Sequence, residues 1–482
     1  MTREIEPKAP SLQSATVARA AVAGAALALL VGSLGLFWPG VVMFDSVGQF
    51  AQAQSGQYED WHPPVMALLW HALLALFGGG AGSMLALQLS LYWLGFGLVA
   101  ASVVRGGRVL AAVAVLVIAA LPLFAGWQGV VLKDTQMLGA TLAAVGLIAW
   151  WRVRGARLPI GALAAVVVLL GYATLVRANA VLAIVPLAVL LFGPARWWAC
   201  GVIALVGIVV ALALAQVINH RVIGAAPSGV ERTEALYDLA GIAVRDPDGA
   251  VGLTPAEARV VLAKHCVKPL FWDPLGTEDR CAPELARLHG FPAGDLYRML
   301  AEAVVRHPLE YAAHRLGHWN SSERWLVAAN WPAAAPPAAS EPNALRLGSP
   351  GKAAAAWQAA ARWIAATPLG WPIAWLTLAV AGLCVTLRRP ATALCALAQA
   401  LLVSAIALEA SFLLLSIASD LRYHLWPMIA TALATVLLCA DARWSRRALL
   451  ATGGALAVVI AAGTVARVML PAPPISYQAL LL

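Results

Sequence analysis

Long apolar runs recur along most of this chain. From Thr16 to the C-terminal end, runs of about 17–22 residues alternate with shorter polar segments. Each run is long enough to cross the ~30 Å hydrocarbon core of a bilayer as an α-helix. The pattern therefore predicts an all-α, polytopic membrane protein.

Composition supports this prediction and excludes other classes. A chain of 482 residues is long enough for two or three soluble domains, but 61% of its residues are hydrophobic and only 12% are charged. Soluble domains have roughly 45–50% apolar and 25% charged residues. A soluble enzyme, a disordered scaffold, a β-barrel and a nucleic-acid-binding domain all fit this composition poorly.

The net charge of +9 is unevenly distributed. The one long polar stretch, 219–366, holds 15 basic and 15 acidic residues, so the remaining chain carries the whole excess. That excess lies in short loops between apolar runs, which is the positive-inside pattern of membrane proteins rather than a polyanion-binding patch. We expect membrane lipid as a partner and no nucleic acid.

Five basic clusters predict the cytoplasmic loops. They are Arg105/Arg108, Arg152/Arg154/Arg157, Arg196, Arg388/Arg389 and Arg443/Arg446/Arg447. The first apolar run follows Arg3, Lys8 and Arg19 without a cleavage site, so we interpret it as a retained helix with a cytoplasmic N-terminus. About 11 spans are predicted, at 17–37, 83–104, 109–126, 134–151, 158–176, 179–194, 197–217, 367–387, 391–416, 424–440 and 448–469.

The apolar run from Pro64 to Phe77 is too short for an ordinary span. Runs of 10–14 residues are more often interfacial or re-entrant. If this run does not cross, all five basic clusters fall on one side, so we expect 38–82 to lie on the outer side and 62–80 not to span. A short true span, with inverted topology after it, is the alternative.

The segment 219–366 is predicted to be a small, mostly helical, extracytoplasmic domain. It separates an N-terminal transmembrane core, 1–218, from C-terminal transmembrane helices, 367–482. Helical patterns occur at about 254–264, 295–305 and 308–318, and an Ala/Pro segment from Pro332 to Ala339 is interpreted as flexible.

Histidines and cysteines in the segment 219–366 lead to two smaller expectations. His314 and His318, four residues apart, are better explained by a solvated helix face than by a metal site. Cys266 and Cys281 are the only two of six cysteines in the segment. The exterior is oxidising, so a disulfide between them is expected.

The first outer loop contains Asp45 near the start of a short helix whose Val47, Phe50 and Ala51 share one face. Such a helix suits the membrane interface. Asp45 either carries chemistry or caps this helix. The loop then reaches Glu59 and Asp60, which are rival acids, before His62-Pro63-Pro64.

Other ionisable residues lie at the outer ends of predicted spans, where they are costly and point to function. Lys133-Asp134 follows a short loop, Arg177 opens one span, and Arg422-Tyr423 opens another. A guanidinium beside a helix N-terminus suits a phosphate group. The alternatives are lipid anchoring for the cations and helix capping for Asp134. Glu409, inside its span, either pairs with an arginine or lines a cavity.

These features resemble a known family. An acid in the first outer loop, an interfacial helix and His62-Pro63-Pro64 before an apolar run resemble the membrane-embedded glycosyltransferases of the C superfamily (GT-C). That family includes protein O-mannosyltransferases and the enzymes that add aminoarabinose to lipid A. The Lys133-Asp134 loop resembles their second acidic loop, and Arg422-Tyr423 a late Arg-Tyr of some members. The resemblance covers roughly 15–190 and is weak across 219–366.

The resemblance implies an enzyme of the bacterial inner membrane with its active site facing the periplasm or exterior. It would move a hexosyl or pentosyl group from a polyprenyl-phosphate carrier to an extracytoplasmic glycolipid, polysaccharide or protein, with inversion. Asp45 would be the general base. Lys133, Arg177 or Arg422 would bind the donor phosphate, with His62 and Tyr423 as further substrate-binding residues.

Two assignments remain open within this interpretation. Asp134 would orient the acceptor, orient Lys133, or share a divalent ion with Asp45. Many family members have two adjacent acids in the first loop, whereas Asp45 is followed by Ser46. Lys133 also supplies a positive charge without a metal, so we favour no metal and no cofactor.

Two other functions fit parts of the sequence. An O-antigen ligase or polymerase would use similar lipid-linked substrates. A transporter or flippase of lipid-linked saccharides predicts inverted repeats and broken helices near the midplane, and neither is clear here. The polar residues gather instead at one face of the predicted membrane region. The sequence does not specify the sugar, the acceptor or the prenyl length.

Overall fold

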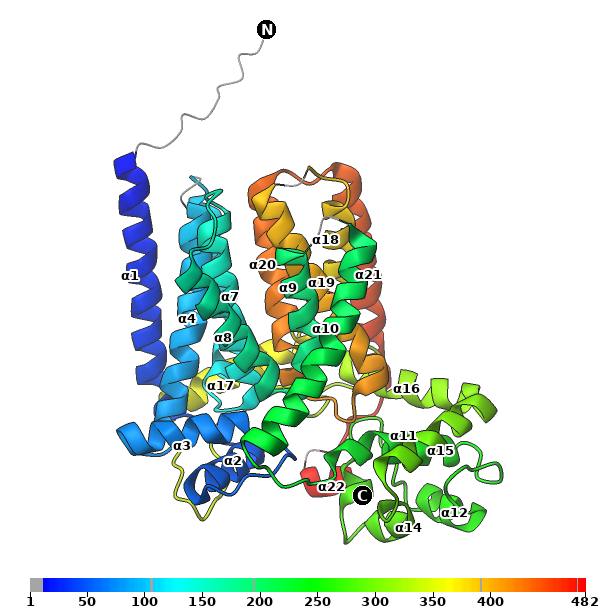
Figure 1. The fold of residues 1–482 in the computed structure, drawn as a ribbon. Helices are drawn as coiled ribbons and strands as arrows, with labels where there is room; N and C mark the ends of the chain where they lie inside the picture. The colour runs from blue at the N-terminus through cyan, green and yellow to red at the C-terminus, as the bar shows by residue number, and fades with distance from the viewer. Residues whose placement is uncertain (1–11, 105–106, 194–195, 391, 475) are drawn as a thin grey trace.

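A computed structural model of the chain describes residues 12–104, 107–193, 196–390, 392–474 and 476–482 (Figure 1). Within these ranges the chain forms helices and isolated bridges but no strand. The upright helices of Figure 1 coincide with the predicted spans: α1 (Leu12–Phe37), α4 (Gly82–Val104), α5 (Val109–Ala119), α7 (Lys133–Arg152), α8 (Ile160–Val176), α9 (Val181–Phe192), α10 (Trp197–Val217), α18 (Pro372–Thr386), α19 (Ala393–Leu415), α20 (Leu425–Asp441) and α21 (Arg446–Met469).

The described part of the chain has the apolar helices of a polytopic membrane protein. Six helices are long and apolar enough to cross a bilayer. A seventh candidate is the bent pair of α5 with α6 (Pro122–Gln128), which turns by 55° at the break before Pro122. The predicted single span 109–126 is therefore two helices. Because α8, α9 and α18 are shorter and α7 is not among these candidates, the count of eleven crossings stays a prediction.

Small residues bring α4 and α7 together at the centre of the N-terminal half. A Cβ built on Gly95 of α4 would lie 2.4 Å from the carbonyl carbon of Leu142 in α7. One built on Gly146 of α7 would lie 2.7 Å from the Gly95 carbonyl oxygen. Glycines allow two backbones to approach this closely, which is how helices gain packing energy within a bilayer.

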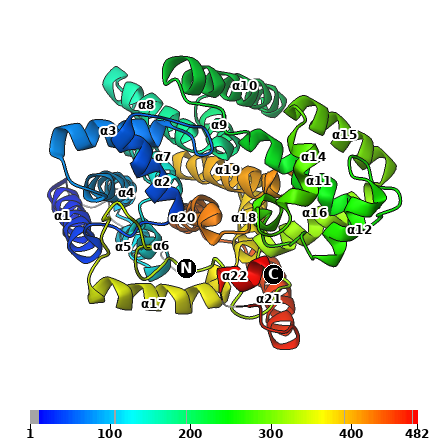
Figure 2. The ribbon, with the colours of Figure 1, turned by 90° about the horizontal axis from the view of Figure 1, so that it is seen from below.

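Helices at one end of the bundle lie across the upright ones (Figures 1 and 2). They are α2 (Phe44–Ser55), α3 (Val65–Phe77) and α17 (Lys352–Ala366). Met66 and Trp70 of α3 are buried, whereas Leu76 and Phe77 are each 75% exposed. This helix is half-buried and shorter than the candidate spans, and that 62–80 does not cross stays a prediction.

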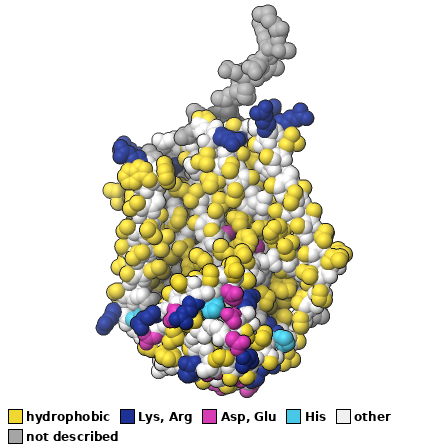
Figure 3. All heavy atoms as spheres, turned by 90° about the vertical axis from the view of Figure 1, so that its right-hand side faces the viewer, with side chains coloured by type: hydrophobic (Ala, Val, Ile, Leu, Met, Phe, Trp, Pro, Cys, Tyr) yellow, Lys and Arg dark blue, Asp and Glu magenta, His cyan; other side chains and the backbone are white. Residues whose placement is uncertain are grey.

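Basic residues gather at the opposite end of the molecule, beyond a belt of hydrophobic side chains (Figure 3). Arg108 Nε donates to Ala440 O at 2.7 Å, and Arg389 Nη1 donates to Leu438 O at 2.8 Å. Both arginines thus donate to carbonyls in the last turn of α20, where cations are favoured. Two of the predicted cytoplasmic loops therefore meet on one side. Arg105 lies outside the described residues.

The helices α11 to α16, which we call the outer domain after its predicted location, share a hydrophobic core of their own. Its helices are α11 (Thr233–Ala243), α12 (Pro255–Ala263), α13 (Asp273–Gly276), α14 (Ala286–His289), α15 (Ala293–Arg306) and α16 (Pro308–Ser322). The three predicted helices correspond to α12, α15 and α16. The predicted disulfide between Cys266 and Cys281 is confirmed.

The later part of 219–366 packs against the membrane core instead of the outer domain. Gln358 of α17 donates to Gly126 O of α6 at 2.9 Å, and Leu347 and Ala354 belong to the core of the bundle. In the Ala/Pro segment, Ala333 accepts a backbone hydrogen bond from Leu421 at 3.0 Å. Figure 2 shows α17 along a different side of the bundle from α11, α15 and α16.

The expectation of a solvated face for His314 and His318 is wrong. Both side chains are buried, with residue exposures of 3% and 0%. His314 Nε2 lies 3.2 Å from Asp238 Oδ1, and His318 Nδ1 lies 2.8 Å from Pro269 O. Burial lowers the pKa of His318 to about 3, so this histidine is a neutral core residue. The helical pattern alone did not indicate that α11 covers this face.

Short elements complete the described chain. They are the π-turn η2 (Ile218–Val222), the 3₁₀ segments η1 (Ala178–Ala180), η3 (Val230–Arg232), η4 (Ala282–Leu285), η5 (Pro368–Gly370) and η6 (Leu421–His424), and the final helix α22 (Tyr477–Leu481). Of these, η1 and η6 lie at the outer ends of α9 and α20, and they contribute to the site described next.

Candidate functional site

Two extended segments run side by side into α2 and α7. Val41 N donates to Gly129 O at 3.0 Å, and Val131 N donates to Val41 O at 2.8 Å, as in a parallel bridge. The two chains therefore approach the outer surface together and in the same direction. As a result, the first turns of α2 and α7 begin next to each other.

The two helices also begin with the same local pattern. Asp45 and Asp134 are each the second residue of a helix, and a hydroxyl residue follows each one. Ser46 Oγ accepts from Met43 N, and Thr135 Oγ1 accepts from Leu132 N, both at 3.2 Å. Neither acid caps its helix, so the capping alternative is wrong for both. The helix dipoles favour both carboxylates in this position.

Buried polar side chains hold the start of α7 in place. Ser46 Oγ donates to Val131 O, which ties α2 to the segment before α7. Gln88 of α4 donates to Gln128 O at 2.6 Å and to Val130 O at 2.9 Å. Gln136 donates in turn to Gln88 at 3.0 Å. Ser46, the residue after Asp45, thus serves as a structural tie.

Three side chains surround the Asp45 carboxylate. Arg422 Nη2 lies 3.1 Å from it, and Lys133 Nζ and His62 Nε2 each lie 3.5 Å from it. Burial raises the pKa of Asp45, but the positive charges of Arg422 and Lys133 outweigh burial and hold this pKa well below its ordinary value. In the resting site Asp45 is a stable carboxylate and a weak base.

His62 connects Lys133 with Asp45. Lys133 Nζ lies 2.5 Å from His62 Nδ1, and the other ring nitrogen faces Asp45. Burial, followed by the charge of Lys133, lowers the pKa of His62. A neutral imidazole fits both contacts, because Nδ1 then accepts from the ammonium group and Nε2–H points at the carboxylate.

Asp134 is held by two arginines. Arg177 Nη1 pairs with its Oδ1, and Arg422 Nε lies 3.8 Å from its Oδ2. The Tyr423 ring lies under both guanidinium groups, 4.2 Å from Arg177 Cζ and 5.4 Å from Arg422 Cζ. Arg422 therefore bridges the two acids, and the tyrosine face fixes the planes of both arginines.

All seven predicted site residues lie in this one cluster. They are Asp45, His62, Lys133, Asp134, Arg177, Arg422 and Tyr423. The rival acids of the first loop do not join it. Asp60 accepts from Ser228 N at 2.6 Å and lies 3.4 Å from His220, while Glu59 contacts Gln52 at the surface.

Two members of the cluster were not among the predicted site residues. Asp420 Oδ2 lies 3.0 Å from Arg422 Nη2, and Asn179 Oδ1 accepts from Arg177 Nε at 2.6 Å. Each lies two residues from its arginine in sequence. That spacing, at the start of a helix, is the signal that identifies both as positioning residues for the arginines.

A cavity of about 300 Å³ opens beside the cluster. Lys133, Arg177 and Tyr423 form its polar wall, which carries two cations. Phe412 and Leu415 of α19 form an apolar wall, and the outer domain closes it with lining residues that include Val230, Glu231 and Tyr297. A cavity with cations on one wall and hydrocarbon on another fits an amphiphilic anion. Leu415 is 56% exposed, so this wall continues to the surface of the molecule.

Comparisons with known proteins give little beyond a distant likeness of fold. No protein-family model matches the chain, and a search of curated proteins finds no match. Two solved structures of ArnT from Cupriavidus metallidurans resemble it. The structure bound to undecaprenyl phosphate has 17% sequence identity to this chain and a TM-score of 0.29. The match covers 89% of this chain and 78% of the ArnT chain. The apo structure has 16% identity, a TM-score of 0.28, and covers 88% and 77%.

Proposed function

We propose that the protein is a membrane glycosyltransferase that moves a sugar from a polyprenyl-phosphate carrier to an extracytoplasmic acceptor. The observation that carries this proposal is the joint placement of two carboxylates and three cations, Lys133, Arg177 and Arg422, beside a partly apolar cavity. The motifs of the first outer loop, which resemble those of GT-C enzymes, point to the same function.

The donor phosphate is proposed to bind Lys133 and Arg177 at the cavity wall, together with Arg422, which precedes the lining residue Tyr423. In the resting site the negative charges that pair with these cations are the carboxylates of Asp45, Asp134 and Asp420. A phosphate that enters would replace Asp45 as a partner of Lys133 and Arg422. The prenyl chain would leave along Phe412 and Leu415 towards the lipid.

Asp45 is the proposed general base. Its side chain is 15% exposed, against 3% for Asp134. When phosphate neutralises Arg422 and Lys133, the pKa of Asp45 rises, because these two charges are what keep it low. Without the donor, Asp45 is therefore a weak base, and donor binding makes Asp45 a stronger base.

The proposed transfer is a single displacement with inversion. The acceptor hydroxyl gives its proton to Asp45 while its oxygen forms the new bond to the anomeric carbon. The bond from that carbon to the phosphate oxygen breaks, and polyprenyl phosphate leaves with the negative charge stabilised by Arg177, Arg422 and Lys133. Asp134 positions both arginines, and His62 positions Lys133. No step needs a metal or another cofactor.

The alternatives predict a different arrangement or a different donor. A transporter needs its polar site near the membrane midplane, whereas η1, η6 and the first turns of α2 and α7 are at the outer end of the bundle. A ligase or polymerase that uses a diphosphate carrier would need to accommodate a second phosphate. We therefore favour the monophosphate donor.

The test uses purified protein in liposomes with polyprenyl-phosphate sugars and an outer-envelope extract as acceptor. We expect release of free polyprenyl phosphate and transfer of label to the acceptor fraction. Polyprenyl-diphosphate saccharides serve as the comparison donor. Turnover of only the diphosphate donor would overturn the monophosphate proposal, and movement of intact donor between leaflets without transfer would indicate a flippase. Mass spectrometry of surface glycans from a deletion strain would then identify the acceptor.

A further inference from the structure

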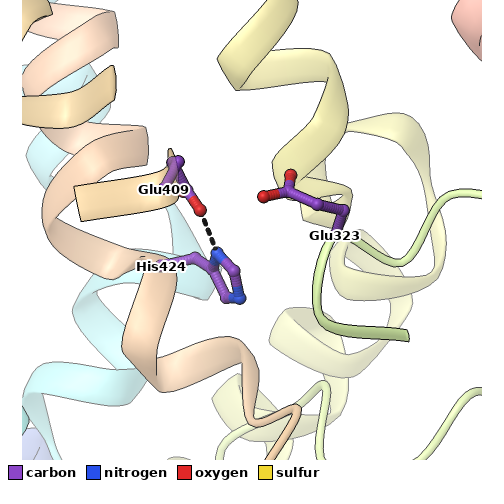
Figure 4. Close-up of side chains that lie close together, drawn as sticks. All are labelled: Glu323, Glu409 and His424. Carbon is purple, nitrogen blue, oxygen red and sulfur yellow. Dashed lines mark hydrogen bonds and ion pairs between the residues drawn. The ribbon is translucent and has the colours of Figure 1, made fainter. Parts of the chain in front are cut away.

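A second group of ionisable side chains lies at the junction of the outer domain and the bundle. Glu323 directly follows α16, Glu409 belongs to α19, and His424 ends η6 (Figure 4). All three are buried, with residue exposures of 0% to 1%. None of them is part of the proposed transfer site.

The three side chains point at one another. His424 Nδ1 lies 2.6 Å from Glu409 Oε2. Each of the three residues offers one possible ligand atom, and these three atoms all lie within 4.8 Å of one another. Figure 4 shows the Glu323 carboxylate directed at the Glu409–His424 pair from the opposite side. The expectation that Glu409 pairs with an arginine is wrong, since its partner is a histidine.

The carboxylates lack the partners that such burial normally requires. Within the described residues, both carboxylate oxygens of Glu323 and Oε1 of Glu409 are buried without a hydrogen bond. No lysine or arginine among those residues pairs with either acid. Arg324, the next residue, turns its guanidinium to Trp331 O, Pro332 O and Ser419 O instead. Two buried acids without a cation are costly.

We propose that Glu323, Glu409 and His424 bind a divalent transition-metal ion, with Zn²⁺ as the best fit. Two carboxylate oxygens and one imidazole nitrogen form a common ligand set for Zn²⁺. The imidazole disfavours Ca²⁺ and Mg²⁺, which prefer oxygen ligands. The ion would replace the proton in the Glu409–His424 contact, so binding releases protons into solution.

This site goes beyond the proposed function, because it positions residues rather than reacts. His424 is adjacent to Tyr423 and two residues from Arg422 in the short segment η6. A metal held by α16, α19 and η6 would fix that segment and join the outer domain to the bundle. It would thereby stabilise the orientation of Arg422 and Tyr423 without contacting substrate.

The direct test is metal content. Full-length protein purified without added metal is analysed by plasma mass spectrometry, and we expect about one Zn²⁺ per chain, falling about tenfold or more in Glu323→Gln, Glu409→Gln and His424→Gln. Glu278→Gln and His289→Gln, in the outer domain, are the matched controls and should retain the metal. Wild-type protein without stoichiometric metal, even after incubation with Zn²⁺, would overturn the proposal and leave a shared proton between the acids.

A second measurement uses wild-type protein alone, so that its result does not depend on whether the variants fold. Wild-type protein stripped by a chelator is reloaded with Co²⁺, whose visible absorption reports nitrogen and oxygen ligands, and its thermal midpoint is followed during Zn²⁺ titration. We expect a visible band and a rise in midpoint that saturates with the metal, as binding to the folded state requires. A featureless spectrum together with an unchanged midpoint would refute the site.

Discussion

Two clusters of acidic side chains lie near the same end of the helical bundle, and they differ in the basic side chains that pair with them. Asp45 and Asp134 share Lys133, Arg177 and Arg422. Within the described residues, by contrast, Glu409 pairs with His424 and Glu323 pairs with no basic side chain. The first cluster opens on a cavity, and the second is closed. The segment η6 contributes to both, through Arg422 and His424.

The difference shows how acidic side chains in two clusters come to favour different ligands, an anion at the first cluster and a metal ion at the second. Cations at the first cluster can exchange a carboxylate partner for a phosphate, so that cluster suits an anionic substrate. Acids at the second cluster lack a strong cation, so that cluster suits a metal ion. Burial makes both preferences stronger, because charges interact more strongly where water is excluded. The following predictions test this contrast.

The largest effect is expected for Asp45→Asn. The amide keeps the size of the side chain but cannot take the acceptor proton, so we expect transfer to fall ~100-fold or more, the usual scale for a lost general base. Glu59→Gln, in the same loop but outside the cluster, is the control and should retain near-wild-type kcat. If Asp45→Asn stays active, the base lies elsewhere and the functional contrast between the clusters fails.

Replacing the arginines by lysine tests the phosphate site. Arg177→Lys and Arg422→Lys keep the charge but lose the bidentate geometry that suits phosphate. Losing one charged hydrogen bond of about 1.5–3 kcal/mol corresponds to a rise in donor KM of roughly 10-fold or more. Arg298→Lys, on an exposed face of α15, should leave KM unchanged. Unchanged KM in both site variants would reduce these arginines to lipid anchors.

Measuring both transfer and metal content on a variant of each cluster tests whether the two clusters are separate sites. Asp45→Asn should lose transfer and keep its metal. Glu323→Gln should lose its metal, unfold at a lower temperature and raise donor KM only a few-fold, because its effect on Arg422 is indirect. Metal content, thermal midpoint and donor kinetics measured on both variants provide the check. Loss of metal in Asp45→Asn would mean that the two clusters form a single site.

The smallest effect concerns pH and His62. Burial and the charge of Lys133 lower the pKa of His62 below its ordinary value of about 6.5, so it is neutral at pH 7. Acid places an imidazolium beside Lys133 and Arg422 and removes the acceptor of the Lys133 hydrogen bond. We expect kcat/KM to be flat down to about pH 6.5 and to fall below it.

The pH profile of His62→Asn should lack that acid limb, at the cost of a few-fold lower activity. Asp45 does not produce the limb, because Arg422 and Lys133 hold its pKa well below the ordinary carboxyl range, burial notwithstanding. His71→Asn, on α3 and directed at Ala53 O, is the control and should keep the wild-type profile. A limb that survives in His62→Asn would assign it to another group.

Hydropathy made much of this architecture predictable. Apolar runs placed the helices, and the imbalance of basic residues predicted that 62–80 does not cross. The few ionisable residues beside apolar runs were informative because such residues are costly at the membrane surface and within it. Their positions along the sequence, together with the motif resemblance that added His62 and Tyr423, identified seven of the nine members of the first cluster before any contact was known.

The partners within each cluster were decided by the tertiary structure alone. Hydropathy fixes how deep a residue lies along the membrane normal, but not which helices are neighbours. That order depends on close packing, as between Gly95 and Gly146, because lipid gives helices no hydrophobic reason to choose one neighbour. Hence the sequence indicated that Glu409 needed a partner, but only the fold brought His424 and Glu323 to it, and only the fold placed Arg422 between Asp45 and Asp134.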